Sequence, residues 1–148
     1  MALTPFIDAL PIPKVLKPKE RCRHGTFYEV KMSEFFHRFH SELPPTKVWG
    51  YEGQLPGPTI EVEQGEKTHI KWINKLPDKH FLPVDHTLHG SGEHMPEVRT
   101  VVHLHGAEVE PESDGYPEAW FTSDFKKCGP RFVHKVYTYE NNQRPAML

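Results

Sequence analysis

Prolines are spread through this sequence and restrict its fold more than any other feature. The chain has 148 residues, of which 15 are proline and 10 are glycine, and its proline share is about twice the usual value of roughly 5%. Proline breaks helix interiors and removes a hydrogen-bond donor from central strands. The sequence therefore excludes a helical bundle and favours short strands joined by turn-rich connections, as in an all-β sandwich or barrel.

Alternating apolar and charged residues predict where the strands lie. Residues 59–74 are expected to form a hairpin that turns at Gln64-Gly65. Residues 32–40 contain no helix breaker, so a short helix there is a second interpretation. The other predicted strands are 26–39, 98–106 and 131–140.

The remaining segments are rich in turn-forming residues. Residues 43–58 and 75–97 are expected to be long loops, and 111–125 a series of turns. In that last segment the expected buried anchors are Trp120 and Phe121. The prolines of residues 1–24 predict an extended arm that lies across a sheet and buries a few apolar side chains. Residues 25–148 are then a single domain, because the sequence shows no repeat and no linker.

Charge and hydropathy give no indication of binding to nucleic acid or of a membrane span. The net charge is −2, so nothing suggests a nucleic-acid-binding surface. No apolar run approaches the roughly 18 residues needed to span a membrane. The first residues lack the basic segment of a secretory signal, which favours synthesis in the cytoplasm. The two cysteines, Cys22 and Cys128, do not make a disulfide framework, and the sequence leaves open whether they pair.

Eleven histidines raise the expectation of a metal site. His103 and His105 stand one residue apart near the end of the predicted strand 98–106. On a strand they would share a face, with Cα atoms roughly 6.5–7 Å apart, while Leu104 would point into the core. Two such rings can close on one metal or serve two neighbouring metals, and imidazole suits copper, zinc, iron and nickel. Two ligands are too few for a tight site, so a water-facing pair remains an alternative.

A second interpretation of the pair is a cupin-type site. That pattern follows the two histidines with a ligand glutamate, and Glu110 lies at a tolerable offset. However, Glu97 and Pro117 stand where the pattern requires glycine. Three further histidines lie in the predicted loop 75–97: His86, His89 and His94. They could bind a metal adventitiously, but the favoured interpretation is that they face water.

Several segments, in order along the chain, resemble the multicopper oxidase family. The segment "GQLPGPTIEVEQGE" followed by "VVHLHG" resembles the first domain of that family. Further segments resemble bacterial laccases of the spore coat protein A type, a subgroup that also shows bilirubin oxidase activity. They are "FIDALPIP", "LPPTKVWGYEGQLPGPTIEV", "HFLPVDHTLHG" and "SDGYPEAWFTSDF". The resemblance runs from Phe6 to about Pro145 and implies a cupredoxin-like Greek-key β-sandwich.

The resemblance also implies a chemistry. Laccases oxidise phenol-type donors at a type 1 copper and pass the electrons to a trinuclear copper cluster, where oxygen is reduced to water. By position, His103 matches a ligand of the type 2 copper and His105 a ligand of a type 3 copper. Asp114 matches an acidic residue that helps deliver protons. On residue grounds alone, Asp114 is an ordinary turn residue before Gly115.

The sequence departs from the family pattern in what it lacks. The family cluster uses four H-x-H pairs, and this chain carries one; the His-Cys-His stretch of the type 1 copper is also missing, and Cys128 has no flanking histidines. We therefore expect an incomplete first cupredoxin domain without its last strands, not catalytically competent alone. Its expected partners are copper ions and either the remaining laccase domains or a second copy through unpaired strands; the resemblance implies a spore coat location.

Two other functions remain open at this point. One is a small metal-binding or interaction module that uses the cupredoxin scaffold without redox chemistry. The other is a mononuclear cupin-like metal enzyme that uses His103, His105 and Glu110.

Overall fold

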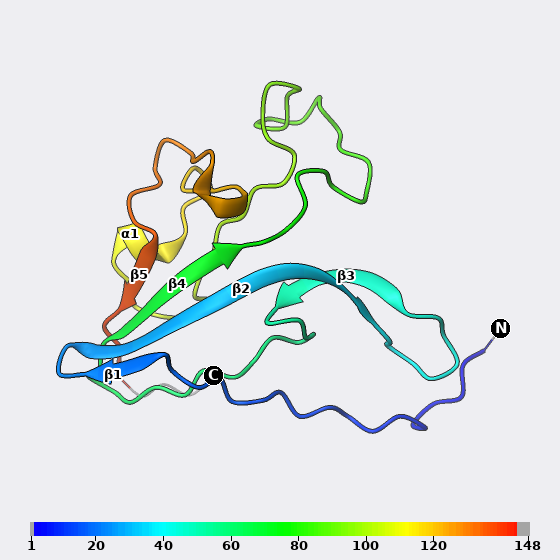
Figure 1. The fold of residues 1–148 in the computed structure, drawn as a ribbon, viewed down its shortest axis with the longest axis horizontal. Coiled ribbons are helices and arrows are strands. Elements are labelled where there is room, and N and C mark those ends of the chain that lie inside the picture. The colour runs from blue at the N-terminus through cyan, green and yellow to red at the C-terminus, as the bar shows by residue number, and fades with distance from the viewer. Residues whose placement is uncertain (1, 145–148) are drawn as a thin grey trace.

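The computed structural model describes residues 2–144, and these form one five-stranded sheet with two short helical turns (Figure 1). The strands are β1 (Glu20–Cys22), β2 (Gly25–His37), β3 (Thr46–Tyr51), β4 (Thr68–Asn74) and β5 (Val136–Tyr139). The helical turns are α1 (Pro111–Asp114) and the 3₁₀ turn η1 (Ser123–Phe125). The predicted all-β class is therefore confirmed. No helix in the described part of the chain is long and apolar enough to cross a membrane.

The long strand β2 organises the sheet, whose order is β1-β2-β4-β5. The first half of β2 pairs antiparallel with β1 and parallel with β4, and its second half pairs antiparallel with β3. β5 pairs antiparallel with the other edge of β4. Because β2 continues as a strand to His37, the alternative helix over 32–40 does not form.

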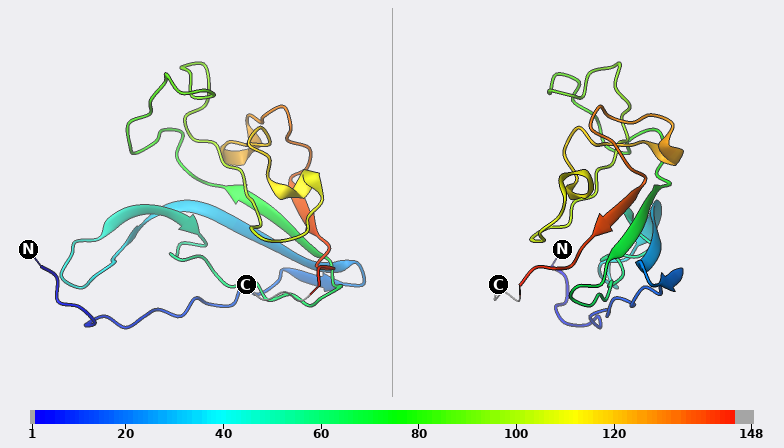
Figure 2. Two further views of the ribbon diagram at one scale, coloured as in Figure 1. Left: turned by 180° about the vertical axis from the view of Figure 1, so that it is seen from behind. Right: turned by 90° about the vertical axis from the view of Figure 1, so that its left-hand side faces the viewer.

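Every second side chain of the central strands is buried, as the two-residue period of a strand requires. In β4 the buried positions alternate strictly with half-buried ones. Segments between residues 98 and 132 lie over this inner face beside β4 and β5 (Figure 2). Within residues 2–144, loops and α1 rather than a second sheet form that covering layer. The buried core consists of Tyr28, Val30, Met32, Ile70, Trp72, Leu76, Val98, Val102, Phe121, Tyr137 and Tyr139.

Strand β3 lies inside the segment 43–58, where the sequence predicted only a loop. The prolines of this segment flank the strand and do not interrupt it. Between them, Val48, Trp49 and Tyr51 favour a strand conformation. The second half of β2 supplies the partner for β3, a long-range pairing that local turn chemistry does not reveal.

The predicted hairpin over 59–74 is wrong. The turn at Gln64-Gly65 is present, but of the two arms only β4 is a strand. Residues 59–63 cannot pair with β4, because β2 and β5 already occupy both of its edges. Thr59 instead forms a parallel bridge with the N-terminal arm.

The predicted strand over 98–106 is also absent. Thr100 forms a single bridge, to Phe121, and no neighbouring strand continues the ladder. The chain then turns at positions 105–106. As a result Leu104, which was expected in the core, is 40% exposed. The predicted strand 131–140 is likewise reduced to the four residues of β5.

The N-terminal arm is extended, as expected, and runs along one side of the molecule (Figure 1). Its last residues form β1, which pairs with β2. The expectation that the arm buries a few apolar side chains is met only near its end, where Leu16 packs partly buried against the core. Phe6 is fully exposed, and Leu10 and Ile12 are each 90% exposed. Hydrogen bonds hold the first residues of the arm, for example the bond from the Thr4 amide to the Glu42 carboxylate at 2.9 Å.

Candidate metal site at His103 and His105

The two histidines lie just beyond a buried anchor residue. Val102 packs in the core and is 5% exposed. After it, the chain turns at His105 and Gly106, and Gly106 has a φ of 79°. Glycine adopts such a positive φ without steric cost. His103 and His105 therefore lie at an exposed turn and not on a strand. The buried side chain of Val102 anchors this turn to the core.

A close glycine contact places Asp114 beside His103. Pro111 begins α1, and proline suits the first position of a helix. Gly115 ends it in the left-handed conformation, with a φ of 83°. A Cβ atom at Gly115 would lie 2.2 Å from the Val102 carbonyl oxygen, so only glycine fits. The end of α1 can thus approach the residue before His103 and hold Asp114 there.

The contact between His103 and Asp114 fixes which ring nitrogen can bind a metal. His103 Nδ1 lies 2.6 Å from the Asp114 carbonyl oxygen and 3.2 Å from its Oδ1. A carbonyl oxygen only accepts hydrogen bonds, so Nδ1 donates and Nε2 keeps its lone pair. Hydrogen bonds of this kind set the tautomer of metal-binding histidines. His103 therefore presents Nε2 as a metal ligand.

The rings of His103 and His105 are neighbours despite the absence of a strand. Their centroids are 5.8 Å apart and their planes are inclined by 74°. Imidazole nitrogen suits copper, so the kind of donor fits the metal that the sequence resemblance implies. The number of donors does not complete a site, because no three His, Cys, Asp or Glu side chains gather as metal ligands within residues 2–144.

The same finding bears on the cupin-type alternative. Glu110 precedes α1 and is exposed, and its carbonyl oxygen accepts the Ser113 amide at 2.9 Å. No three-ligand group in the described part of the chain contains it. The loop histidines His86, His89 and His94 are exposed.

Next to the histidine pair lies a small apolar pocket that the sequence did not predict. Its volume is about 200 Å³, and Tyr51, Trp72 and Tyr139 supply its aromatic walls. Trp72 and Tyr139 lie in the predicted strand segments 59–74 and 131–140. What the sequence could not supply was the β4–β5 pairing that brings Trp72 Nε1 to 3.1 Å from the Tyr139 hydroxyl.

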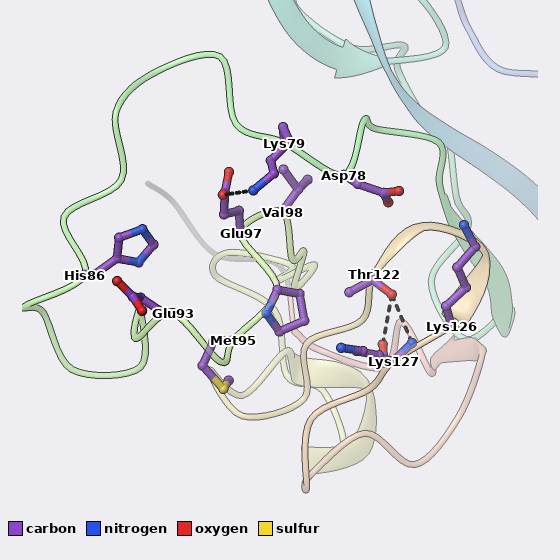
Figure 3. A pocket seen from close by; sticks show the side chains of 11 residues that line it. Asp78, Lys79, His86, Glu93, Met95, Glu97, Val98, Thr122, Lys126 and Lys127 are labelled. Atoms are coloured by element: carbon purple, nitrogen blue, oxygen red, sulfur yellow. Dashed lines mark hydrogen bonds and ion pairs between the residues drawn. The ribbon is translucent and has the colours of Figure 1, made fainter.

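A second hollow, of about 540 Å³, lies between the loop 75–97 and residues 122–127 (Figure 3). It shares no lining residue with the pocket at His103. Its carboxylates and lysines are mixed, and Lys79 is paired with Glu97 at 2.5 Å. The Thr122 hydroxyl is taken up by the backbone of Lys127. Within residues 2–144, the hollow contains no group of three metal-binding side chains.

Both cysteines are free and exposed. Cys22 lies in β1 and Cys128 follows η1. The question of pairing that the sequence left open is thereby answered for this structure.

Fold and site together define an all-β protein that carries two neighbouring histidine rings on an exposed turn. Residues 37–97 match the family model "Multicopper oxidase". This part of the chain is therefore similar to a multicopper oxidase domain, a family whose name implies copper. The matched range ends before His103 and His105.

Relatives extend the similarity over the whole chain. A laccase of Bacillus subtilis (strain 168) is 55% identical over 150 residues, which cover 100% of this chain and 29% of that protein. A laccase of Bacillus stratosphericus is 53% identical, again over 100% of this chain and 29% of that protein. This chain thus spans less than a third of the length of these relatives.

Solved structures confirm the cupredoxin-like fold. The crystal structure of a multi-copper oxidase from Pediococcus acidilactici matches with a TM-score of 0.66 and 24% identity. The match covers 92% of this chain and 23% of that chain.

Proposed function

We propose that this chain is part of a laccase-like multicopper oxidase and contributes His103 and His105 to its copper site. The single observation that carries the proposal is the 55% identity to a laccase along the whole chain. The adjacent imidazole rings support it, because within residues 2–144 no hydrogen bond occupies His103 Nε2, and the His105 ring lies 5.8 Å away. In the implied assignment, His103 serves a type 2 copper and His105 a type 3 copper.

Bound copper would supply the one-electron chemistry that couples oxidation of phenol-type donors to reduction of oxygen to water. The residues of this chain would hold the copper and orient its ligands. Asp114 keeps the His103 ring in the tautomer with a free Nε2 through the 2.6 Å bond to Nδ1. We also propose that the Asp114 carboxylate, which is partly exposed to water, holds and passes on protons at this site. Proton transfer by positioned carboxylates is a common catalytic contribution.

The proposed oxidase needs more copper ligands than the described residues bring together. Two histidines are fewer than the three or more protein ligands of typical catalytic metal sites. We therefore propose that this chain alone does not turn over donors. The partners that would cover its exposed apolar arm are the remaining domains of a laccase-length protein or a second copy. A spore coat location is part of the proposal, and it rests on the sequence resemblance.

Copper titration of the purified 148-residue chain, followed by electron paramagnetic resonance, tests the metal assignment. We expect weak binding of about one copper per chain with a nitrogen-ligand signature. His103→Ala and His105→Ala should each abolish that signature. His89→Ala is the matched control, because this exposed loop histidine lies outside the site. Unchanged copper binding in both site variants would contradict the assignment of His103 and His105 as ligands.

Other outcomes of the same titration separate the alternatives. Several coppers per chain would contradict the incomplete site, as would four-electron oxygen reduction by the chain alone. One firmly held metal that is lost in Glu110→Gln would favour the cupin-like enzyme. No histidine-dependent copper binding at all would favour an interaction module.

A further inference from the structure

The apolar pocket beside His103 has the features of a small-molecule site. Its volume is about 200 Å³, below the roughly 300–1,000 Å³ of sites for drug-sized ligands, so it suits a molecule with one ring. The deeply buried part of its lining is made by Val30, Trp72, Val102 and Tyr139, each 9% exposed or less. The more open part is made by Tyr51, Pro58, Ile60, His103 and Leu104.

One buried polar group in this lining has an unused donor. The Tyr139 hydroxyl accepts the indole N–H of Trp72 at 3.1 Å. Within residues 2–144, the Tyr139 hydroxyl donates no hydrogen bond of its own, although the residue is only 4% exposed. A buried hydroxyl that lacks an acceptor is costly, and a ligand that supplies one relieves that cost.

The aromatic walls favour a flat ligand. The Tyr51 and Trp72 rings are 5.5 Å apart between centroids and inclined by 59°. Tilted arrangements of this kind are favourable between aromatic rings, and a third ring can join them. A phenol is already neutral near pH 7 at its ordinary pKa of about 10, and burial raises the pKa of both Tyr51 and Tyr139 further. A neutral, apolar ligand therefore fits better than a charged one.

We propose that this pocket binds a neutral one-ring aromatic molecule with a hydrogen-bond acceptor, which takes the O–H of Tyr139. The ring lies against Tyr51, Trp72 and Val102. The site depends on the sheet and the Val102 segment, and not on copper at the histidines.

Nuclear magnetic resonance of the 148-residue chain tests this with two matched probes, anisole and ethylbenzene. They have nearly the same shape, but only anisole carries an acceptor oxygen. The indole N–H signal of Trp72 is identified by eliminating the other two tryptophans in the variants Trp49→Phe and Trp120→Phe. We expect saturable shifts of the Trp72 signal only, with anisole bound about five-fold more tightly than ethylbenzene, the value of one neutral hydrogen bond.

Variants locate the contact. Tyr139→Phe removes only the hydroxyl and should lower anisole affinity to that of ethylbenzene, while ethylbenzene binding stays unchanged. Ile60→Phe fills the mouth of the pocket and should abolish binding of both probes. Val62→Phe is the control, because Val62 is 51% exposed and does not line the pocket; it should bind as the unmodified chain does.

Three results would overturn the proposal. The first is the absence of a saturable Trp72 shift with anisole. The second is equal affinity for the two probes in the unmodified chain, a comparison that needs no variant to fold. The third is a Trp72 signal that moves with protein concentration and not with anisole, since a second copy of the chain would then occupy the pocket.

Discussion

Gly115 is the residue on which the geometry of the histidine site depends. Its φ is 83°, and a Cβ atom there would lie 2.2 Å from the Val102 carbonyl oxygen. We expect Gly115→Ala to lower the free energy of unfolding by about 1–3 kcal/mol, because both the backbone strain and the clash oppose folding. The displaced α1 should also loosen the contact between Asp114 and His103. Urea unfolding measures the first effect, and the His103 ring signals measure the second.

Gly90→Ala is the matched control for this prediction. Gly90 also has a positive φ, 76°, but nothing lies within 4 Å of a Cβ atom there. Its replacement should cost only the backbone strain, about 1 kcal/mol, and leave the His103 signals in place. If the two variants lose equal stability, the close approach to Val102 is not what fixes α1.

The free thiols provide a second prediction about single residues. Although Cys128 is exposed as a residue, partial desolvation of its sulfur raises the pKa of the thiol, an effect that the nearby charge of Lys135 partly offsets. Since the thiolate is the reactive form, alkylation of Cys128 by iodoacetamide should be slow in the folded chain and several-fold faster in urea. Mass spectrometry of the modified peptides measures this, with Cys22 as the internal control. A Cys22–Cys128 disulfide, or no acceleration in urea, would contradict it.

The sequence predicted the burial of single residues correctly where burial depends only on the alternation within one strand. The alternation in β2 predicted that Tyr28, Val30 and Met32 lie on one face, and all three are buried. On residue grounds Asp114 was only a turn residue, and its approach to His103 depends on packing between segments that local patterns do not encode. Leu104 was misplaced for the same reason, because the turn after it ends the alternation.

The loop between β4 and the Val98 segment is closed by a single carboxylate. Glu97 binds the Lys79 ammonium at 2.5 Å and accepts the His80 amide at 3.2 Å (Figure 3 shows the Lys79 contact). The hydrogen bond from Lys79, then that from the His80 amide, lowers the Glu97 pKa. Glu97 therefore ties the end of the loop to its beginning.

This loop closure should depend on pH. The folded-state pKa lies below the unfolded value, about 4.3 for glutamate, so the stabilisation is complete above that value and is lost as the pH falls through the folded pKa. Glu97→Gln should weaken the loop at neutral pH and differ progressively less from the unmodified chain below about pH 4.3. Hydrogen exchange of the His80 amide reports the loop directly. Glu93→Gln, on the same loop, should show no such pH-dependent difference.

At the scale of elements, the sequence predicted which segments are extended better than it predicted their partners. β2 lies within two residues of the predicted strand 26–39. β3 was missed and the hairpin over 59–74 was wrong, because each depends on which edges of β2 and β4 are free. Edge occupancy is decided by strands far apart in sequence, such as β5, so local alternation cannot supply it.

The whole molecule exposes more surface than a compact chain of its size. Its accessible surface is 10884 Å², whereas a folded monomer of 17.2 kDa is expected to expose about 7,800 Å². The excess includes large apolar side chains on the arm, led by Phe6, Leu10 and Ile12. The edge of β3 that faces away from β2 has no strand partner within residues 2–144. Unpaired edges and exposed apolar side chains both promote association.

We therefore expect the isolated chain to self-associate. Sedimentation velocity should show a sedimentation coefficient that rises with protein concentration. Burial of one such side chain is worth roughly 1.5–3 kcal/mol, so replacing Phe6, Leu10 and Ile12 together by serine should weaken association at least about ten-fold. Replacing Lys14, Lys17 and Lys19 by serine alters the same arm without removing apolar surface and should not weaken association. If the unmodified chain stays a monomer at all concentrations and melts cooperatively, its exposed surface needs no partner, and the proposed covering by other laccase domains or a second copy loses its physical reason.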